Sequence, residues 1–377
     1  MTVPLSRVAA LVAGALLLLL AAPLVASAKP PITKKTAKPP ITKKTAKPTV
    51  FGHRGSAGYR PEHTLAAYEL GARMGADYIE PDLVSTKDGV LICRHEPNIT
   101  DTTDVADHAE FADRKTTKTI DGVTQTGWFT TDFTYAEIKT LRAKERLPAV
   151  RQRNTLYDRR YHVPTFQQVI DLSKKLSKEL HRQVGIVPET KHPTFFASLG
   201  LDVTGKLVKA LNKNKLNTPL SKVVVQSFEI GNLKALNKVL KVPLLQLIDS
   251  AGGPADQNGN VTYDQMSTAQ GLKDISAYAD WVGPSKDRIV PLNVDKTSGT
   301  PTSFVKDAHA AGLLVGPFTF RNENQFMAAE FRRGDPADPN FPNLYGNAFA
   351  EYAQFFALGI DGLFSDNPDT AIAARGH

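Results

Sequence analysis

Short apolar, strand-like segments alternate with amphipathic, helix-like segments from Thr49 onward, and this alternation limits the fold more than any other feature. The strand-like segments lie at residues 49–53, 77–85, 90–95, 184–191, 222–228, 243–249, 279–284, 313–320 and 360–366. The helical patterns lie between them, at residues 62–75, 165–180, 204–214, 229–240, 302–312 and 347–359. This order predicts βαβ units and a parallel sheet. About eight such units in about 320 residues favour an α/β fold closed into a (β/α)₈ TIM barrel over an open sheet.

Two stretches interrupt the alternation. Residues 98–160 are polar and carry few apolar periods, so we interpret them as an insertion over one end of the barrel, after the early strands. Residues 251–260 contain three Gly and two Asn and predict a surface loop. No GxGxxG turn follows the first strand-like segment, which argues against a dinucleotide-binding fold. We therefore assign residues 49–377 to one barrel domain.

The positive charge of the chain belongs to its N-terminal part. The formal net charge is +8, from 46 Lys and Arg against 38 Asp and Glu. Residues 1–50 contain Arg7, seven lysines and no acidic residue, so the rest of the chain is formally neutral. A nucleic-acid-binding domain carries its excess charge on the folded surface. The composition therefore does not favour a nucleic-acid partner.

The first residues have the pattern of an export signal. Arg7 precedes an apolar run at residues 8–25, and Ala-Ser-Ala follows, which suits cleavage after Ala28. A retained membrane anchor is the alternative, because the run is nearly long enough to span a bilayer. Pro23 and the small residues after it favour cleavage. We predict a signal peptide at residues 1–28 and a secreted, extracytoplasmic protein.

A lysine and proline repeat follows. "AKPPITKKT" occupies residues 28–36 and recurs unchanged at residues 37–45. The unit has too little apolar surface to offset the entropy of ordering, so we predict a disordered linker at residues 29–48. Two roles remain open for it. It is either a solubilising spacer or a polycation that holds the protein near an anionic cell-envelope polymer.

Three carboxylates have the spacing of a cation site. Glu80 and Asp82 are two residues apart on one predicted strand, so both face the same side. Glu189 follows on a later strand. Carboxylates confined together need a cation or a shared proton. An oxygen-only set suits Ca²⁺ or Mg²⁺, and the absence of HxH and HExxH spacings disfavours zinc.

Two histidines and two cationic side chains are predicted at the same end of the barrel. His53 ends the first strand-like segment, and His95 ends the segment at residues 90–95. Strand ends of a parallel barrel share one rim, where two imidazoles can serve as general base and general acid. Arg54 and Lys191 supply positive charge for a phosphate oxyanion.

Each residue taken alone has an ordinary structural explanation. A histidine at a strand end is more often a hydrogen-bonded structural residue than a catalyst. Glu62 and His63 follow Pro61, where capping or turn formation explains them as well as catalysis does; Glu62 is also a candidate partner to orient His53. The lone Cys93 lies in an apolar run and is expected to be buried and inert. The case for a site rests on the number of polar groups at successive strand ends, which breaks the apolar pattern.

The motifs then become recognisable. "GHRGSAGYRPEHT", "YIEPDLVSTKDG", "RHEPNITDTTDV", "PETKHP", "QSF" and "LGIDGLFSDNPD" together resemble the glycerophosphodiester phosphodiesterase family, and most closely its secreted, periplasmic-type members. The resemblance covers the chain from about Val50 to Asp369. It implies a (β/α)₈ barrel that hydrolyses glycerophosphodiesters to glycerol 3-phosphate and an alcohol.

The resemblance also implies a role for each site residue. His53 and His95 become the acid/base pair, with His95 as the acid. Glu80, Asp82 and Glu189 become ligands of one divalent cation, Ca²⁺ or Mg²⁺. The same resemblance makes Arg54 and Lys191 contacts of the substrate phosphate.

The chain departs from the family pattern in two respects. Glu96 follows His95 where family members commonly have Asp, which alters a hydrogen bond near His95 but leaves the imidazole in place. Pro81 and Pro188 lie within the two carboxylate-bearing strands and remove one backbone donor each. We therefore expect those strands to be irregular near the metal.

Three alternative functions remain open from the sequence. Related barrels share this carboxylate set and act on lysophospholipids as phospholipase D-like enzymes. Wall teichoic acid is a polyanion of glycerol phosphodiesters that suits a lysine-rich linker. A protein of another class, a non-catalytic wall-attached module, would bind phosphodiesters without turnover, although no group of the proposed site is missing.

Overall fold

The computed structural model of the chain describes residues 47–376. The predicted signal peptide and residues 29–46 of the predicted linker lie outside the described residues, as does His377. Among the described residues, no helix combines the length and the apolar character that a membrane crossing requires.

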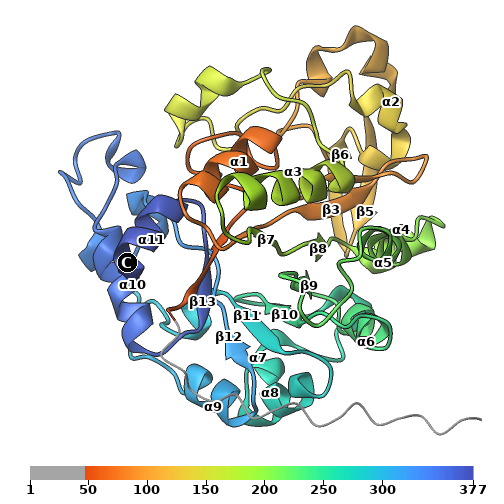
Figure 1. Ribbon diagram of the computed structural model, residues 1–377. Helices are drawn as coiled ribbons and strands as arrows, with labels where there is room; N and C mark the ends of the chain where they lie inside the picture. The colour runs from red at the N-terminus through yellow and green to blue at the C-terminus, as the bar shows by residue number, and fades with distance from the viewer. Residues whose placement is uncertain (1–46, 377) are drawn as a thin grey trace, which may run out of the picture. The chain divides into compact units, whose positions relative to one another are not determined.

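Parallel strands close into a (β/α)₈ barrel, which confirms the fold predicted from the alternation (Figure 1). The barrel strands are β1 (Thr49–Gly52), β2 (Tyr78–Ile79) continued by β3 (Asp82–Ser85), β7 (Gly185–Ile186) continued by β8 (Glu189–Thr190), β9 (Val225–Ser227), β10 (Leu244–Ile248), β11 (Trp281–Pro284), β12 (Leu314–Val315) and β13 (Gly362–Ser365). Barrel neighbours pair in parallel, and β13 returns to pair with β1. The backbone N–H of Asp361 donates to the carbonyl of Val315 at 2.9 Å and joins β12 to β13.

The two carboxylate-bearing strands are broken at proline, as expected. β2 and β3 are separated at Pro81, and β7 and β8 at Pro188. Proline has no N–H to donate but its carbonyl still accepts. The N–H of Glu189 donates to Pro81 O at 3.0 Å, and that of Gln226 to Pro188 O at 2.9 Å. The ladder therefore continues on one side of each proline, and Asp82 lies in register with Glu189.

The expectation that residues 90–95 form a parallel barrel strand is wrong. β4 (Leu91–Cys93) pairs antiparallel with β3, through a tight turn in which Gly89 has φ +78°. The physical reason is length, because a parallel return needs a crossover of about a dozen residues or more. The hairpin still carries His95 to the rim, since Arg94 N donates to Asp82 O at 3.1 Å.

Helices surround the barrel, and all six helical patterns are confirmed. They form α1 (Leu65–Arg73), α3 (Phe166–Glu179), α5 (Val203–Lys213), α6 (Ile230–Asn237), α9 (Phe304–Ala310) and α10 (Ala348–Ala357). Thr165 caps α3 in a reciprocal capping box with Gln168. The sequence did not predict α8 (Ala269–Ser276), which has a glycine inside, or α11 (Pro368–Arg375), which begins with a proline. Short helices α4 (Pro193–Ser198) and α7 (Tyr263–Met266) lie in the rim loops.

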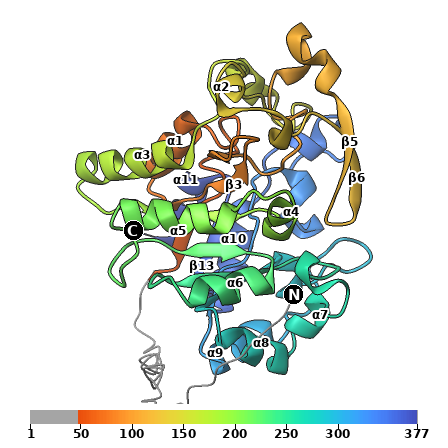
Figure 2. The ribbon, with the colours of Figure 1, turned by 90° about the vertical axis from the view of Figure 1, so that its right-hand side faces the viewer.

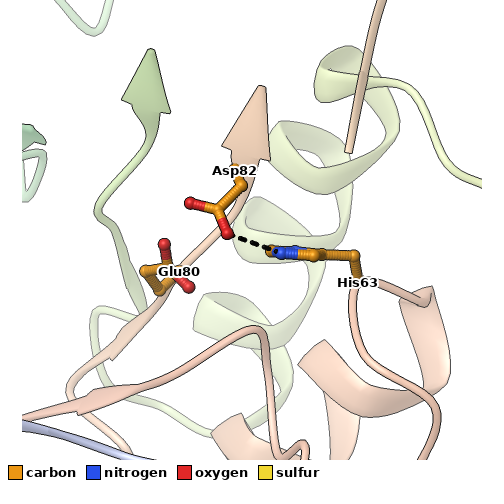
Figure 3. A group of neighbouring side chains, drawn as sticks. All are labelled: His63, Glu80 and Asp82. Carbon is orange, nitrogen blue, oxygen red and sulfur yellow. Dashed lines mark hydrogen bonds and ion pairs between the residues drawn. The ribbon is translucent and has the colours of Figure 1, made fainter. Parts of the chain in front are cut away.

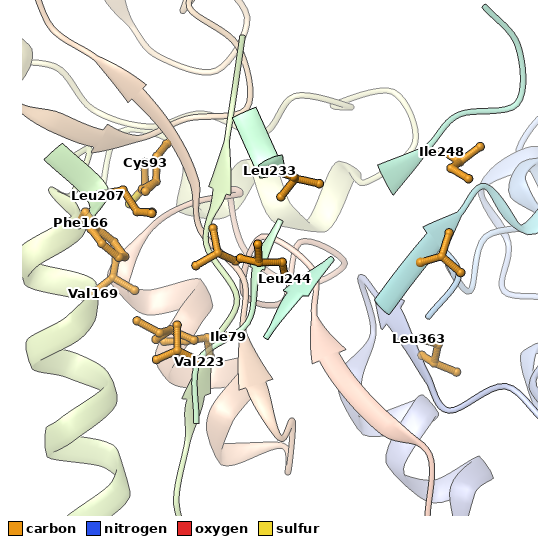
Figure 4. Packing of buried hydrophobic residues seen from close by; sticks show 14 of the residues in the cluster. Ile79, Cys93, Phe166, Val169, Leu207, Val223, Leu233, Leu244, Ile248 and Leu363 are labelled. Atoms are coloured by element: carbon orange, nitrogen blue, oxygen red, sulfur yellow. The ribbon is translucent and has the colours of Figure 1, made fainter. Parts of the chain in front are cut away.

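Apolar side chains fill two layers. Phe166 and Val169 of α3 lie between that helix and the strands (Figure 4). A second cluster comprises Phe51, Val187, Val224, Leu245, Leu247, Trp281 and Phe364. The rings of Phe51 and Phe364 stack with centroids 4.6 Å apart. This second cluster fills the barrel interior, and Leu247 and Phe364 form the floor of the cavity above it.

The segment between β4 and α3 leaves the barrel and returns to its rim. It contains a hairpin of β5 (Thr116–Ile120) and β6 (Val123–Gly127), the short helix α2 (Tyr135–Ile138) and several 3₁₀ turns. The hairpin forms a separate two-stranded antiparallel sheet. In Figure 2 its turn reaches the level of α4. This segment therefore contributes side chains to the site from outside the barrel.

Candidate active site

A cavity of about 750 Å³ opens at the carboxyl ends of the barrel strands. Its lining includes all seven residues singled out from the sequence: His53, Arg54, Glu80, Asp82, His95, Glu189 and Lys191. Ligand pockets of barrel enzymes lie at this end. Residues that are far apart in the sequence are therefore brought together at one place.

The three carboxylates are buried side by side. Glu80 accepts from the N–H of Arg54 at 2.7 Å and from Gln226 Nε2 at 3.0 Å. Glu189 Oε1 lies 3.2 Å from Lys191 Nζ. Burial and the charge of Asp82 raise the pKa of Glu80 well above its usual range, and burial raises the pKa of Glu189 to about 8. The carboxylates thus repel one another unless protons or a cation are bound.

Asp82 carries the feature that best fits a metal ion. Its Oδ1 atom is buried and has no hydrogen-bond partner. An unpaired buried carboxylate oxygen costs free energy, and a divalent cation held by Asp82, Glu80 and Glu189 would satisfy it. Cation binding would also displace the protons that the raised pKa values favour.

His63 lies in the same group but contacts Asp82 rather than offering a free nitrogen (Figure 3). Its Nε2 is 2.8 Å from Asp82 Oδ2, and its Nδ1 is 2.7 Å from the Tyr68 hydroxyl. Both ring nitrogens are therefore engaged. His63 orients Asp82, while the side chain of Thr64 caps α1.

His53 is oriented by Asp366 and not by Glu62, so that expectation is wrong. His53 Nδ1 contacts Asp366 Oδ1, whereas both carboxylate oxygens of Glu62 accept from the single atom Arg54 Nη1, at 3.0 and 2.9 Å. Since β13 pairs with β1 in register, the residues that follow Ser365 and Gly52 are neighbours. Burial lowers the pKa of His53 to about 4, so its imidazole is neutral near pH 7.

Two arginines that were not predicted from the sequence donate hydrogen bonds to Asp366. Arg151 Nη2 donates to Asp366 Oδ2 at 2.6 Å, and its Nε donates to Glu323 at 2.6 Å. Arg321 Nε donates to the same Asp366 oxygen at 2.9 Å. Arg151 comes from the segment between β4 and α3, so that segment also supports the His53 side of the site.

Three side chains, those of Glu96, His192 and Asp121, continue outward from His95, and we call the four residues together the His95–Asp121 chain. His95 Nδ1 is 2.8 Å from Glu96 Oε1, Glu96 Oε2 is 3.0 Å from His192 Nε2, and His192 Nδ1 is 2.6 Å from Asp121 Oδ2. His95 Nε2 remains on the cavity side, 3.4 Å from Lys191 Nζ. Burial, then the charges of Arg54 and Lys191, lower the pKa of His95.

His192 is expected to make stability depend on pH in the alkaline range. Although burial opposes it, hydrogen bonding to Asp121 and Glu96 raises the pKa of His192 to about 9, against an ordinary value of 6.5. The stabilisation is therefore complete below pH 6.5 and is lost as the pH rises through 9. It amounts to at most about 3 kcal/mol.

The measurement is the free energy of unfolding by urea, between pH 6 and pH 10 with chelator present. The wild-type protein should lose more stability over this range than His192→Gln. Parallel pH profiles of the two proteins would show that His192 is not charged in the folded state.

Comparisons with known proteins find related sequences. The model of the Glycerophosphoryl diester phosphodiesterase family matches residues 53–370. The chain is 39% identical over 330 residues to the glycerophosphodiester phosphodiesterase GDPD6 of Arabidopsis thaliana, covering 83% of this chain and 82% of that protein. It is 28% identical over 346 residues to a glycerophosphodiester phosphodiesterase of Haemophilus influenzae, covering 86% and 88%.

Solved structures show the same fold. A phosphodiesterase from Oleispira antarctica, solved in complex with the product sn-glycerol-3-phosphate, superimposes with a TM-score of 0.56 at 17% identity. The match covers 87% of this chain and 96% of that one. At this level of identity the likeness concerns the arrangement of strands and helices.

Proposed function

The chain belongs to the glycerophosphoryl diester phosphodiesterase family, and from that premise we propose that it hydrolyses glycerophosphodiesters to glycerol 3-phosphate and an alcohol. It is thus an enzyme of the phosphoric diester hydrolase class. The observation that carries the proposal is the convergence of His53, His95 and the three buried carboxylates in one cavity. Arg54 and Lys191 lie at the same cavity and favour an anionic substrate.

We propose Glu80, Asp82 and Glu189 as the ligands of one divalent cation, Ca²⁺ or Mg²⁺. When bound, such an ion neutralises phosphoryl charge and lowers the cost of nucleophilic attack. The support is the oxygen-only donor set and the unpaired Oδ1 of Asp82.

We propose that one histidine accepts a proton and that the other donates one. His53 is neutral and its Nδ1 faces Asp366, so it can accept the proton of the nucleophile at Nε2 while Asp366 stabilises the imidazolium that forms. We assign His95 as the donor to the leaving alcohol: burial and the charges of Arg54 and Lys191 lower its pKa, and the hydrogen bond from its Nδ1 to Glu96 opposes that shift by stabilising the charged form. Arg54 Nε donates to His53 Nε2 at 3.3 Å, and we propose that the guanidinium contacts the substrate phosphate beside this atom.

Two nucleophiles can present a proton to His53. One is water, and the other is the glycerol 2-hydroxyl, which would give a cyclic phosphate first. Rapid quenching followed by phosphorus NMR distinguishes them, because only the second route produces a cyclic glycerol phosphate that later opens.

Release of glycerol 3-phosphate from glycerophosphocholine tests the function. We expect residues 29–377 to release it, chelator to remove at least about 99% of the activity, and Ca²⁺ or Mg²⁺ to restore it. Full activity in chelator would contradict the metal proposal. Absence of release with every metal, together with choline release from a lysophospholipid, would move the activity to a lysophospholipase D type.

We also propose that the protein is exported and that its lysine repeat contacts an anionic envelope polymer. The support is the apolar run at residues 8–25 and the seven lysines before Thr49. Deletion of residues 29–46 should slow hydrolysis of a teichoic-acid polymer and leave hydrolysis of glycerophosphocholine unchanged. If the deletion variant and the full protein hydrolyse the polymer at equal rates, the repeat acts only as a spacer.

A further inference from the structure

We propose that Asp121, in the turn of the β5–β6 hairpin, is a positioning residue for His95 and acts through His192 and Glu96. The inference rests on the proposed function, in which His95 exchanges a proton with the substrate. Asp121 lies 26 positions after His95 in the chain, and His192 lies on the far side of α3 in sequence. Only the folded hairpin brings these groups into one line of contacts.

The hairpin holds Asp121 in a defined place. Its strands pair in unbroken register from Thr116 with Gly127 to Ile120 with Val123. Asp121 and Gly122 form the two-residue turn with φ +48° and +81°, which is the conformation that Asp-Gly favours in a tight hairpin. The Asp121 side chain therefore projects from a paired ladder and not from an irregular loop.

Glu96 needs this support because it is partly exposed. The side chains of His95 and Glu96 are 29% and 35% accessible to solvent, and a pair this exposed does little by itself to fix a ring. The Glu96 carboxylate, however, meets His95 with one oxygen and His192 with the other. Glutamate is one methylene longer than aspartate, which suits a carboxylate placed between two rings.

His192 in turn is fixed from both sides. Its two ring nitrogens each face a carboxylate, and only the imidazolium donates to both. Its side chain is 15% exposed, and its backbone has the left-handed φ of +45° that precedes α4. Removal of the Asp121 charge replaces the charge-assisted hydrogen bond at His192 Nδ1 with a weaker neutral one. The side chain of Glu96 should then be less well ordered, and so should the His95 ring that it contacts.

Asp121→Asn is the test, with two matched controls. Asp113→Asn removes an exposed acidic charge from the same segment, and Thr124→Ala removes the cross-strand hydroxyl contact between Thr119 and Thr124. We expect Asp121→Asn to lower kcat on glycerophosphocholine by about tenfold to a hundredfold, with KM changed less than twofold. Both controls should keep wild-type kinetics.

A double variant separates positioning from hairpin folding. Glu96→Gln should lower kcat, and Asp121→Asn should add little to it, because both act on His95 through the same contacts. Additive losses would contradict the proposal. So would a rise in KM with unchanged kcat, wild-type kinetics in Asp121→Asn, or an equal loss of kcat in Thr124→Ala.

Histidine NMR tests whether Asp121 orders the His95 ring, and it needs no measurement of turnover. In protein labelled with ¹⁵N-histidine, the ring signals of His95, assigned with His95→Asn, should shift in Asp121→Asn and not in the two controls. Unshifted His95 signals would overturn the inference. If wild-type protein hydrolyses no glycerophosphodiester, the proposed function fails, and these spectra still show whether Asp121 orders His95.

Discussion

His53→Asn and His95→Asn should each reduce kcat by about a thousandfold, while the fold is retained. Asparagine places its side-chain nitrogen near the position of histidine Nδ1, so it can still donate to Asp366 in one variant and to Glu96 in the other. It has no counterpart of Nε2, the atom that faces the cavity. General acid or base groups contribute about 10² to 10⁴ in rate, and each variant removes one of them.

The measurement is steady-state release of glycerol 3-phosphate with saturating metal. His181→Asn is the matched control, since His181 is exposed and lies at a left-handed φ of +50° that asparagine tolerates. A substrate with a good leaving group, such as a nitrophenyl ester, should restore much of the rate in His95→Asn and little in His53→Asn. The reverse pattern would show that His53 is the acid and His95 is the base.

The sequence predicts the barrel because its signal is periodic and local. Each strand-like segment and each helical pattern can be recognised without knowledge of its partners, and eight of the nine strand-like segments form the parallel barrel. The exception is residues 90–95, where an apolar run does not reveal its direction. The connection between β3 and β4 is five residues long, which is too short for a parallel return, so it indicates an antiparallel pair.

The partners of the site residues were harder to predict, because they depend on contacts distant in sequence. Asp366 lies 313 positions from His53. Asp366 follows the last strand, and the last strand must pair with the first in a closed barrel. The contact between Asp366 and His53 could therefore have been predicted from the fold. Arg151 and Asp121 come from the segment at residues 98–160, whose polar sequence has no period that indicates where its side chains point.

Asp82→Asn should abolish cation binding and reduce turnover by at least about a thousandfold. The Oδ2 atom of Asp82 accepts from His63 Nε2, and the Oδ1 atom is the unpaired one. An asparagine keeps its oxygen toward His63, because the reverse orientation would place its NH₂ group against the ring N–H. Its two N–H donors then point to the place where a cation requires an acceptor.

The variant should therefore fold and yet lose its response to metal. In the wild-type protein, Ca²⁺ or Mg²⁺ should raise Tm, and above Kd the rise should follow the logarithm of the cation concentration, because only the folded state holds the carboxylates together. Asp82→Asn should show no such rise, and Asp171→Asn, an exposed residue of α3, should retain it. A metal-dependent rise that persists in Asp82→Asn would place the cation on other ligands. Loss of activity with the rise intact would give Asp82 a role in contacting substrate, since binding and turnover would then depend on different atoms.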